Sequence, residues 1–344
     1  MKFLFILLFF NNFIFASQHI QVGCSIFDLN GNLLKKFQGN NCAFLNDGRT
    51  LIVYPNEIKM FDRLMQEKWV FKGHFHHQLE IDEDNQQVAL IGAYVKEFLG
   101  CQKTRFDQVV LLNINSGKQI SKFDLFDYKD LFLKKYKVMS DLNSNKLRIN
   151  NIEYDCSTTH LNSIHKIKND VFHSKEPSFK KGNWLINISF ENYVAIFDSQ
   201  IKKLLWYKNL NLKNPIIHDV QLLKNGQLLI YHNNFYNNNK GPLSEVIEYD
   251  PIELKVTKNY HLLINNHQFF KSSTGSIQLL DSGKILFSAY SEKKGEVLLL
   301  KNASGKLELI MSPNYNPIKK IGENFQDGKI VDLSSYLKNN LASF

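Results

Sequence analysis

Short apolar runs alternate with polar turns along almost the whole chain. The runs are rich in Ile, Val, Leu, Phe and Tyr, whereas the turns are rich in Asn, Asp, Gly and Lys. Runs of this kind predict β-strands joined by tight turns, and clear examples are residues 51–54, 88–91, 109–114, 184–188, 194–197, 228–231 and 285–288. Only residues 128–139 predict a helix, because Leu131, Phe132 and Tyr136 follow helical spacing.

Two hairpin patterns recur in a fixed order. The first is an apolar residue, a polar turn that ends in Gly or Asn, and a run of large apolar residues; its copies are residues 44–53, 81–90, 222–230 and 279–287. The Gly or Asn supplies the positive φ that a tight hairpin turn requires. The second pattern follows the first and ends in a strand with an aromatic residue, as in residues 60–71, 112–123, 196–207 and 247–260.

Two hairpins per unit, repeated every few tens of residues, are typical of the blades of a β-propeller. A β-sandwich made of similar hairpins is the alternative, but the chain predicts too many strands for one sandwich. We therefore predict an all-β fold of the β-propeller class, in which the sheets surround a central channel.

The N-terminus has the layout of a secretory signal peptide. One lysine precedes the apolar run 3–10, and Ala16 and Ser17 supply small residues suited to cleavage. We predict a signal peptide over 1–16 and a single propeller domain over 17–344, in a periplasmic or secreted protein with no membrane contact after cleavage. An uncleaved N-terminal anchor is the alternative, although the apolar run is short for a membrane-spanning helix.

The distribution of charge indicates the class of ligand, and the cysteine content indicates the cellular compartment. Lys and Arg outnumber Asp and Glu by 42 to 33, but the charges are scattered, which favours small anionic ligands over nucleic acid. Four cysteines fit an oxidising compartment. Cys24 and Cys42 flank a short hairpin-like segment and form the favoured pair, although spacing alone leaves the connectivity open.

Histidines recur at one phase of the repeat. His77, His160 and His218 each lie at the start of a predicted strand, where the innermost strand of a blade begins at the channel. We expect these three side chains to converge. Neighbouring residues of a strand face opposite sides, so we expect His77 and not His76 to point inward. Histidines can donate, accept and transfer protons near neutral pH, which suits an anionic or phenolic ligand.

Several segments near these histidines occur in the order and spacing of a known family; they are residues 160–164, 218–219, 225–234, 244–249 and 275–279. Over residues 76–300 the chain resembles the bacterial arylsulfotransferases. The resemblance implies a six-bladed periplasmic propeller that transfers a sulfuryl group between phenols without a nucleotide sulfate donor, and we expect no cofactor. In that family a histidine carries the group covalently, while other histidines and an arginine hold the sulfate oxygens.

Mapped by motif, the resemblance makes His160 and His218 catalytic residues that act as acid, base or hydrogen-bond donor. It also places Asn162 in the site. The expected arginine is replaced by Glu245, whose charge would repel sulfate. The expected nucleophile is replaced by Gln278, and a carboxamide cannot carry the sulfuryl group.

We therefore predict substrate-binding roles for His77, Asn162, Gln278 and Glu245. Substitutes for the two lost groups stay open, and the candidates are His261, His267 and Lys271. The leading hypothesis is an arylsulfotransferase-like enzyme that needs no metal. The alternatives are a non-catalytic ligand- or protein-binding propeller and a metal-dependent enzyme that uses the three histidines as ligands. The oligomeric state stays open.

Overall fold

The computed structural model describes residues 18–22, 24–27, 33–132, 139–140, 147–149, 152–157, 160–170, 172–189, 192–212, 216–234, 243–261, 263–264, 267–268, 276–279, 285–291, 295–301, 307–311 and 328–332. The predicted signal peptide lies outside these residues. Among the described helices, none is long and apolar enough to cross a membrane.

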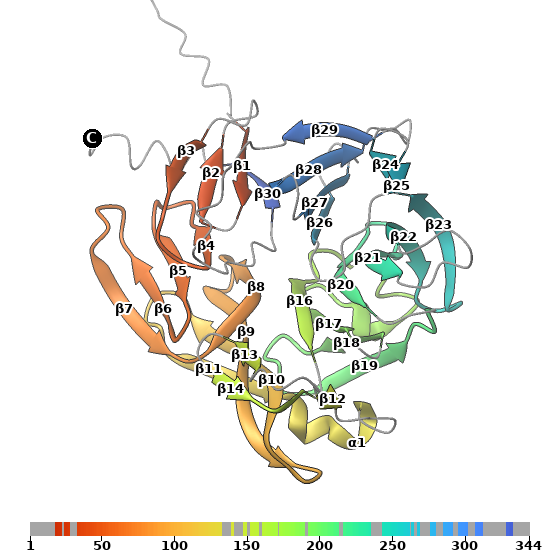
Figure 1. Cartoon of the computed structure of the whole chain (residues 1–344), viewed down its shortest axis with the longest axis horizontal. Helices are drawn as coiled ribbons and strands as arrows, with labels where there is room; N and C mark the ends of the chain where they lie inside the picture. The colour runs from red at the N-terminus through yellow and green to blue at the C-terminus, as the bar shows by residue number, and fades with distance from the viewer. Residues whose placement is uncertain are drawn as a thin grey trace, which may run out of the picture.

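The chain folds as an all-β propeller. Its sheets are arranged in a ring and follow one another in chain order (Figure 1). The described strands form five four-stranded sheets, one six-stranded sheet and two two-stranded ribbons. The blade number that we predicted, six, stays a prediction.

Four of the sheets are simple antiparallel meanders, in which each strand pairs with the next one along the chain. They are β4 (Asn41–Phe44), β5 (Thr50–Tyr54), β6 (Glu57–Phe61) and β7 (Glu67–Lys72); β16 (Leu161–Lys166), β17 (Trp184–Ile188), β18 (Tyr193–Phe197) and β19 (Leu204–Asn209); β20 (Ile217–Leu222), β21 (Leu228–Asn234), β22 (Leu243–Asp250) and β23 (Lys255–His261); and β26 (Ser276–Leu279), β27 (Ile285–Ser291), β28 (Gly295–Lys301) and β29 (Leu307–Met311).

The two ends of the described chain share one sheet. Strand β30 (Gly328–Asp332) pairs antiparallel with β1 (Gln18–Val22), followed by β2 (Ser25–Phe27) and β3 (Leu33–Lys36). Joining the first and last strands in one sheet links the two ends of the ring, which removes an opening where the sheets could separate.

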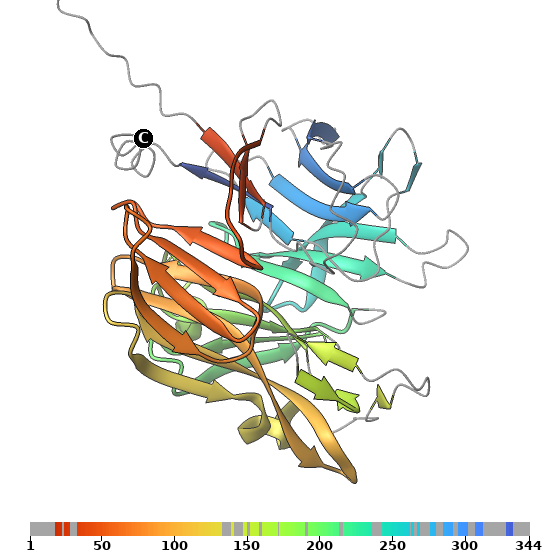
Figure 2. The ribbon, with the colours of Figure 1, turned by 60° about the vertical axis from the view of Figure 1, so that its left-hand side comes forward.

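The largest sheet carries two long strands. Its members are β8 (Phe75–Asp82), β9 (Gln87–Phe98), β10 (Cys101–Asn113), β11 (Gln119–Asp124), β12 (Met139–Ser140) and β15 (Cys156–Ser157). The hairpin of β9 and β10 projects beyond the other sheets (Figure 2). The ribbons are β13 (Leu147–Ile149) with β14 (Ile152–Tyr154) and β24 (Leu263–Ile264) with β25 (His267–Gln268).

The helix predicted over residues 128–139 is too long. The described helical turns here are η1 (Leu125–Tyr128) and α1 (Lys129–Phe132), and a separate turn, η2, covers Pro177–Phe179. Met139 belongs to strand β12, because its backbone pairs with β15. Sheet pairing at this end therefore overrides the helical spacing of the side chains.

Adjacent sheets pack face to face, which explains why the strands are apolar on both sides. In β17, Trp184 and Ile186 belong to a core with the β8–β11 sheet, whereas Leu185 belongs to a core with the β20–β23 sheet. All five residues of β17 are buried. A strand with both faces buried needs apolar residues on both sides. In β17 only Asn187 is polar, and its Oδ1 accepts from the Ser163 amide at 2.6 Å.

The innermost strands are joined by side chains. Strands β4, β8, β16, β20 and β26 each lie at the end of their sheet's strand order, so one edge of each has no partner among the described strands. Polar side chains of one inner strand bond to the backbone of the next: Asn41 Nδ2 donates to the His77 carbonyl (3.1 Å), Gln78 Oε1 accepts from the Ile164 amide (3.0 Å), Ser163 Oγ accepts from the Val220 amide (3.2 Å), and Asp219 Oδ2 accepts from the Ile277 amide (2.9 Å). These bonds fix how far each inner strand is shifted along the central channel relative to its neighbour.

The cysteines form two disulfides, Cys24–Cys42 and Cys101–Cys156. The favoured pair of the sequence is thus confirmed. The second bond joins β10 to β15, where the chain approaches His160.

The hairpin turns contain the expected positive φ angles. Gly48 and Gly226 have φ of +91° and +86°, whereas in the copy at residues 81–90 the positive φ falls on Gln86. A Cβ atom at Gly226 would overlap the Phe172 ring, while one at Gly182, also at positive φ, would meet nothing within 4 Å. Comparing alanine substitutions at the two glycines therefore distinguishes the cost of backbone strain from the cost of steric overlap.

We expect Gly182→Ala to lower the free energy of unfolding by about 1–2 kcal/mol, the cost of a left-handed residue with a Cβ. Gly226→Ala should cost a further ~1–3 kcal/mol, because the methyl group overpacks against Phe172. Urea unfolding of both variants measures the difference. Equal losses would contradict the packing at this turn.

Candidate functional site

A bulge in β8 brings two adjacent histidines to one place. The pairing of β8 with β9 shifts register between Phe75 and Leu79, and His77 has a φ of +57°. A bulge interrupts the alternation of side chains along a strand. The His76 and His77 rings consequently lie 4.5 Å apart between centroids, and both rings lie near His160. Our expectation that only His77 would point inward is therefore wrong.

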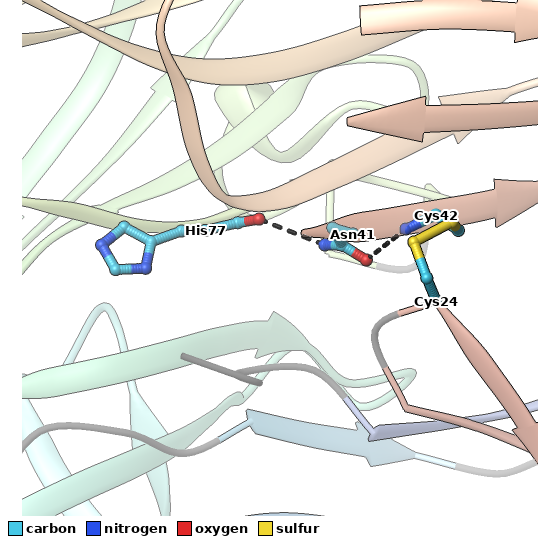
Figure 3. The surroundings of a disulfide bond; sticks show 4 residues. All are labelled: Cys24, Asn41, Cys42 and His77. Atoms are coloured by element: carbon cyan, nitrogen blue, oxygen red, sulfur yellow. Dashed lines mark hydrogen bonds between the residues drawn. A yellow bond between two sulfur atoms is a disulfide. The ribbon is translucent and has the colours of Figure 1, made fainter. Parts of the chain in front are cut away.

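The unusual backbone of His77 is held from the neighbouring sheet. Asn41 Nδ2 donates to the His77 carbonyl oxygen, while Asn41 Oδ1 accepts from the amide of Cys42 at 2.8 Å. Cys42 is in turn bonded to Cys24 (Figure 3). A non-glycine residue at positive φ persists only where its surroundings fix it. Asn41 and the disulfide provide such a support.

His77 and His160 are in direct contact. Their Nε2 atoms lie 2.7 Å apart, although His77 comes from β8 and His160 immediately precedes β16. Both residues are half-buried. The convergence predicted for these two histidines is therefore seen at hydrogen-bonding distance.

A buried ion pair, absent from our predictions, lies behind this contact. Arg105 and Asp107 are on β10, and Arg105 Nη2 donates to Asp107 Oδ1 at 2.7 Å. Arg105 Nη1 donates to His160 Nδ1 at 3.0 Å, and Asp107 Oδ2 accepts from the Leu161 amide at 2.6 Å. The pair thus joins β10 to the start of β16. The sequence signal was the spacing of two opposite charges two positions apart, which places both on one face of a strand.

The electrostatic surroundings keep the histidines neutral and the aspartate charged. Burial, followed by the charges of His76 and His160, lowers the pKa of His77 well below its usual value. Burial, and next Arg105, likewise lowers the pKa of His160. Burial opposes the ionisation of Asp107, but Arg105 and His76 outweigh it and hold the pKa of that carboxyl below its usual range.

The hydrogen bonds fix where the protons of this pair lie. A guanidinium group only donates, so His160 Nδ1 must accept from Arg105. Neutral His160 then carries its proton on Nε2 and donates it to His77 Nε2. The same reasoning places the proton of neutral His77 on Nδ1.

His218 and Asn162 form a second, buried part of the site. Asn162 Nδ2 lies 3.1 Å from the Ile217 carbonyl oxygen and 3.2 Å from His218 Nδ1. The carbonyl can only accept, which fixes the orientation of the amide, and His218 Nδ1 therefore accepts too. Neutral His218 carries its proton on Nε2, an atom that is buried without a hydrogen-bond partner among the described residues.

His218 is also electrostatically coupled to the other two histidines. Burial lowers its pKa to about 4, and its presence contributes to the lowered pKa values of His77 and His160. The site thus presents N–H groups of neutral imidazoles, with Arg105 behind them. Such a set of donors suits an oxyanion.

Glu245 lies in the same sheet as His218, and Gln278 lies in the β26–β29 sheet. The buried Glu245, on β22, lies with Oε1 3.1 Å from His232 Nδ1, and its Oε2 accepts from Asn259 at 2.6 Å. Gln278, on β26, is half-buried. The side chains of His261, His267 and Lys271 lie outside the described part of the structure.

No metal cluster is present in the described part of the chain: no three or more His, Cys, Asp or Glu side chains are grouped to hold an ion. His160 Nδ1 and His218 Nδ1 already accept hydrogen bonds. Their Nε2 atoms carry protons in the neutral rings.

Comparison with known proteins bears on both the fold and the site. A family model described as arylsulfotransferase (ASST) matches residues 56–309. A crystal structure of a protein of unknown function from Bacteroides caccae is similar at 15% identity, with a TM-score of 0.52, covering 85% of this chain and 93% of that one. The beta-propeller domain of Myceliophteria thermophila Cps50 (Swd1) has 10% identity and a TM-score of 0.45, with 85% of each chain covered. No curated protein matches the sequence.

The lowered pKa of His218 predicts an acid-sensitive fold. Unfolding returns this pKa from about 4 to about 6.5, so the unfolded chain binds more protons as the pH falls through this window. Stability due to the neutral ring is complete above pH 6.5 and declines toward pH 4. We expect His218→Gln to remove on the order of 3 kcal/mol of this decline, measured by urea unfolding between pH 7 and pH 4. An unchanged pH slope would contradict the assignment.

Proposed function

Because the chain belongs to the arylsulfotransferase family, we propose that it transfers a sulfuryl group from an aryl sulfate to a phenolic acceptor. The site would be the cluster of His77, His160 and His218. One observation carries the proposal: the imidazoles of His77 and His160 are in contact beside the buried Arg105, and His218 of the next sheet is near enough to lower the pKa of both. Donors fixed in advance stabilise charge as it develops in the transition state.

His160 and His218 would be the catalytic donors. The proton on His218 Nε2 has no partner among the described residues and would bond to the bridging oxygen of the aryl sulfate. The proton on His160 Nε2 lies toward His77 and would turn to a sulfuryl oxygen. Asn162 would keep His218 in the donating tautomer.

Arg105 offers a substitute for the arginine missing at position 245. Its guanidinium bonds to Asp107 as well as to His160, so the pair carries no net charge. Arg105 would act through His160 rather than by clasping the sulfate itself. We retain Gln278 and Glu245 as proposed substrate contacts, with Gln278 orienting the phenol.

The two disulfides and the family together indicate an exported protein. We propose that it works in the periplasm or outside the cell. Its partners would be small phenolic or anionic ligands, without a cofactor or nucleic acid.

The direct test is transfer of sulfate from p-nitrophenyl sulfate to phenol by the purified protein. We expect His160→Ala and His218→Ala each to lower kcat/KM by about 10²–10⁴-fold, the usual effect of losing a catalytic donor or acid. His173→Ala is the matched control, because His173 bonds to the Pro177 carbonyl in an outer turn. No transfer by the wild type across a panel of aryl sulfates and phenols would refute the proposed reaction.

A binding protein without transferase activity is the second candidate. The observation in its favour is Gln278, which stands where the family nucleophile is expected and has no nucleophilic nitrogen. Under this alternative the same cluster would bind aryl sulfates and release them unchanged.

Ligand binding should depend on pH in either case. The free histidines have lowered pKa values and are neutral near pH 7, and a bound anion favours their charged forms. We expect the affinity for p-nitrophenyl sulfate to rise by up to about tenfold per pH unit between pH 7.5 and pH 5.5, as one proton is taken up. Calorimetry measures this, with uncharged p-nitrobenzyl alcohol as control. Affinity that stays constant with pH would contradict proton uptake by the histidines and would mean that the anion is bound by the N–H groups of neutral rings.

A further inference from the structure

We infer that His77 Nε2 carries the sulfuryl group covalently, in place of the histidine missing at position 278, an inference that rests on the proposed function. Three observations lead to it: the direction of the hydrogen bonds, the backbone that presents the His77 ring, and its contact with a donor.

The hydrogen bonds leave one histidine as the acceptor at its Nε2 atom. Arg105 forces His160 Nδ1 to accept, so His160 Nε2 donates and His77 Nε2 accepts. Asn162 forces His218 to hold its proton on Nε2. A nucleophile needs a lone pair, and within this trio only His77 presents one at Nε2.

His77 keeps that lone pair at neutral pH. Burial and the nearby His76, His160 and Arg105 disfavour the protonated ring and lower the pKa of His77. A weakly basic nitrogen is also a good leaving group, because it is stable after the bond to sulfur breaks. A group carried on His77 could therefore pass on to an acceptor.

The backbone of His77 is strained and is held in place by a neighbouring sheet, as is common for residues at functional sites. A positive φ costs a non-glycine residue about 1–2 kcal/mol, and such strain concentrates at functional sites. The β8 bulge aims the ring at His160, and Asn41 holds the carbonyl in place.

The reaction balances in two displacements. The His77 Nε2 lone pair forms a bond to sulfur as the bond from sulfur to the aryl oxygen breaks, and the phenolate leaves with that electron pair, stabilised by the N–H of His218. The modified ring is an imidazolium that bears a sulfonate, so the charge is conserved. An acceptor phenolate then forms a bond to sulfur, the nitrogen–sulfur bond breaks, and the lone pair returns to His77.

The test traps the intermediate. Wild-type protein is mixed with p-nitrophenyl sulfate without an acceptor and quenched in alkali, and its peptides are analysed by mass spectrometry. We expect one equivalent of p-nitrophenol in a burst, and the mass of one SO₃ group on the peptide that contains His77. A label on another residue overturns the inference while leaving the proposed function intact. Absence of both label and release overturns the two together.

Substitution of His77 tests whether this residue is the nucleophile. His77→Gly should fold, because glycine accepts the positive φ, and it should lose the burst and at least about 10³-fold in kcat/KM. Added imidazole should restore p-nitrophenol release by occupying the vacated space. His173→Gly is the matched control and should keep both burst and turnover. A normal burst in His77→Gly would overturn the inference, and if this variant fails to fold, the position of the label in the wild type decides.

Discussion

The structure depends on how the innermost strands satisfy their free edges. Each of β4, β8, β16, β20 and β26 pairs with a strand on one side only, and buried backbone amides and carbonyls are costly without partners. Side chains from the neighbouring inner strand supply part of the missing bonds, as Ser163 does for the Val220 amide and Asp219 for the Ile277 amide. Because each bond crosses from one sheet to the next, the ring holds its inner strands at fixed heights.

The candidate site uses the same device. Asp107 accepts from the Leu161 amide and thereby places His160, while Asn162 donates to the Ile217 carbonyl and thereby orients His218. Asn41 holds the carbonyl of His77. Arg105 and Asn162, which bond across neighbouring sheets, also determine the tautomers of His160 and His218. The same hydrogen bonds therefore join the sheets and orient the histidines. Replacing Asn41, Asp107 or Asn162 would disturb both the packing of the sheets and the site.

The sequence predicted what depends on local pattern and missed what depends on contacts between sheets. Strand composition and glycine turns predicted the all-β fold, and the repeat phase predicted the contact between His77 and His160. The bulge at His77 was missed because the β9 pairing that creates it involves residues distant in sequence. Arg105 was missed because its spacing from Asp107 places both charges on one face of a strand but does not say which other strand that face meets. The helix predicted over 128–139 is confirmed only at Lys129–Phe132, and its predicted end is wrong because Met139 pairs with a strand, β15.

The position of the disulfides connects the site to the compartment where the chain folds. Cys42 follows Asn41, whose side chain holds the His77 carbonyl (Figure 3), and Cys156 pairs with Thr104 beside Arg105 on β10. The Cys24–Cys42 disulfide thus lies near the support of His77, and the Cys101–Cys156 disulfide lies near Arg105, which bonds to His160. In a reducing compartment both supports would lose their covalent bond. An oxidising compartment therefore favours the fold and the alignment of the two histidines together.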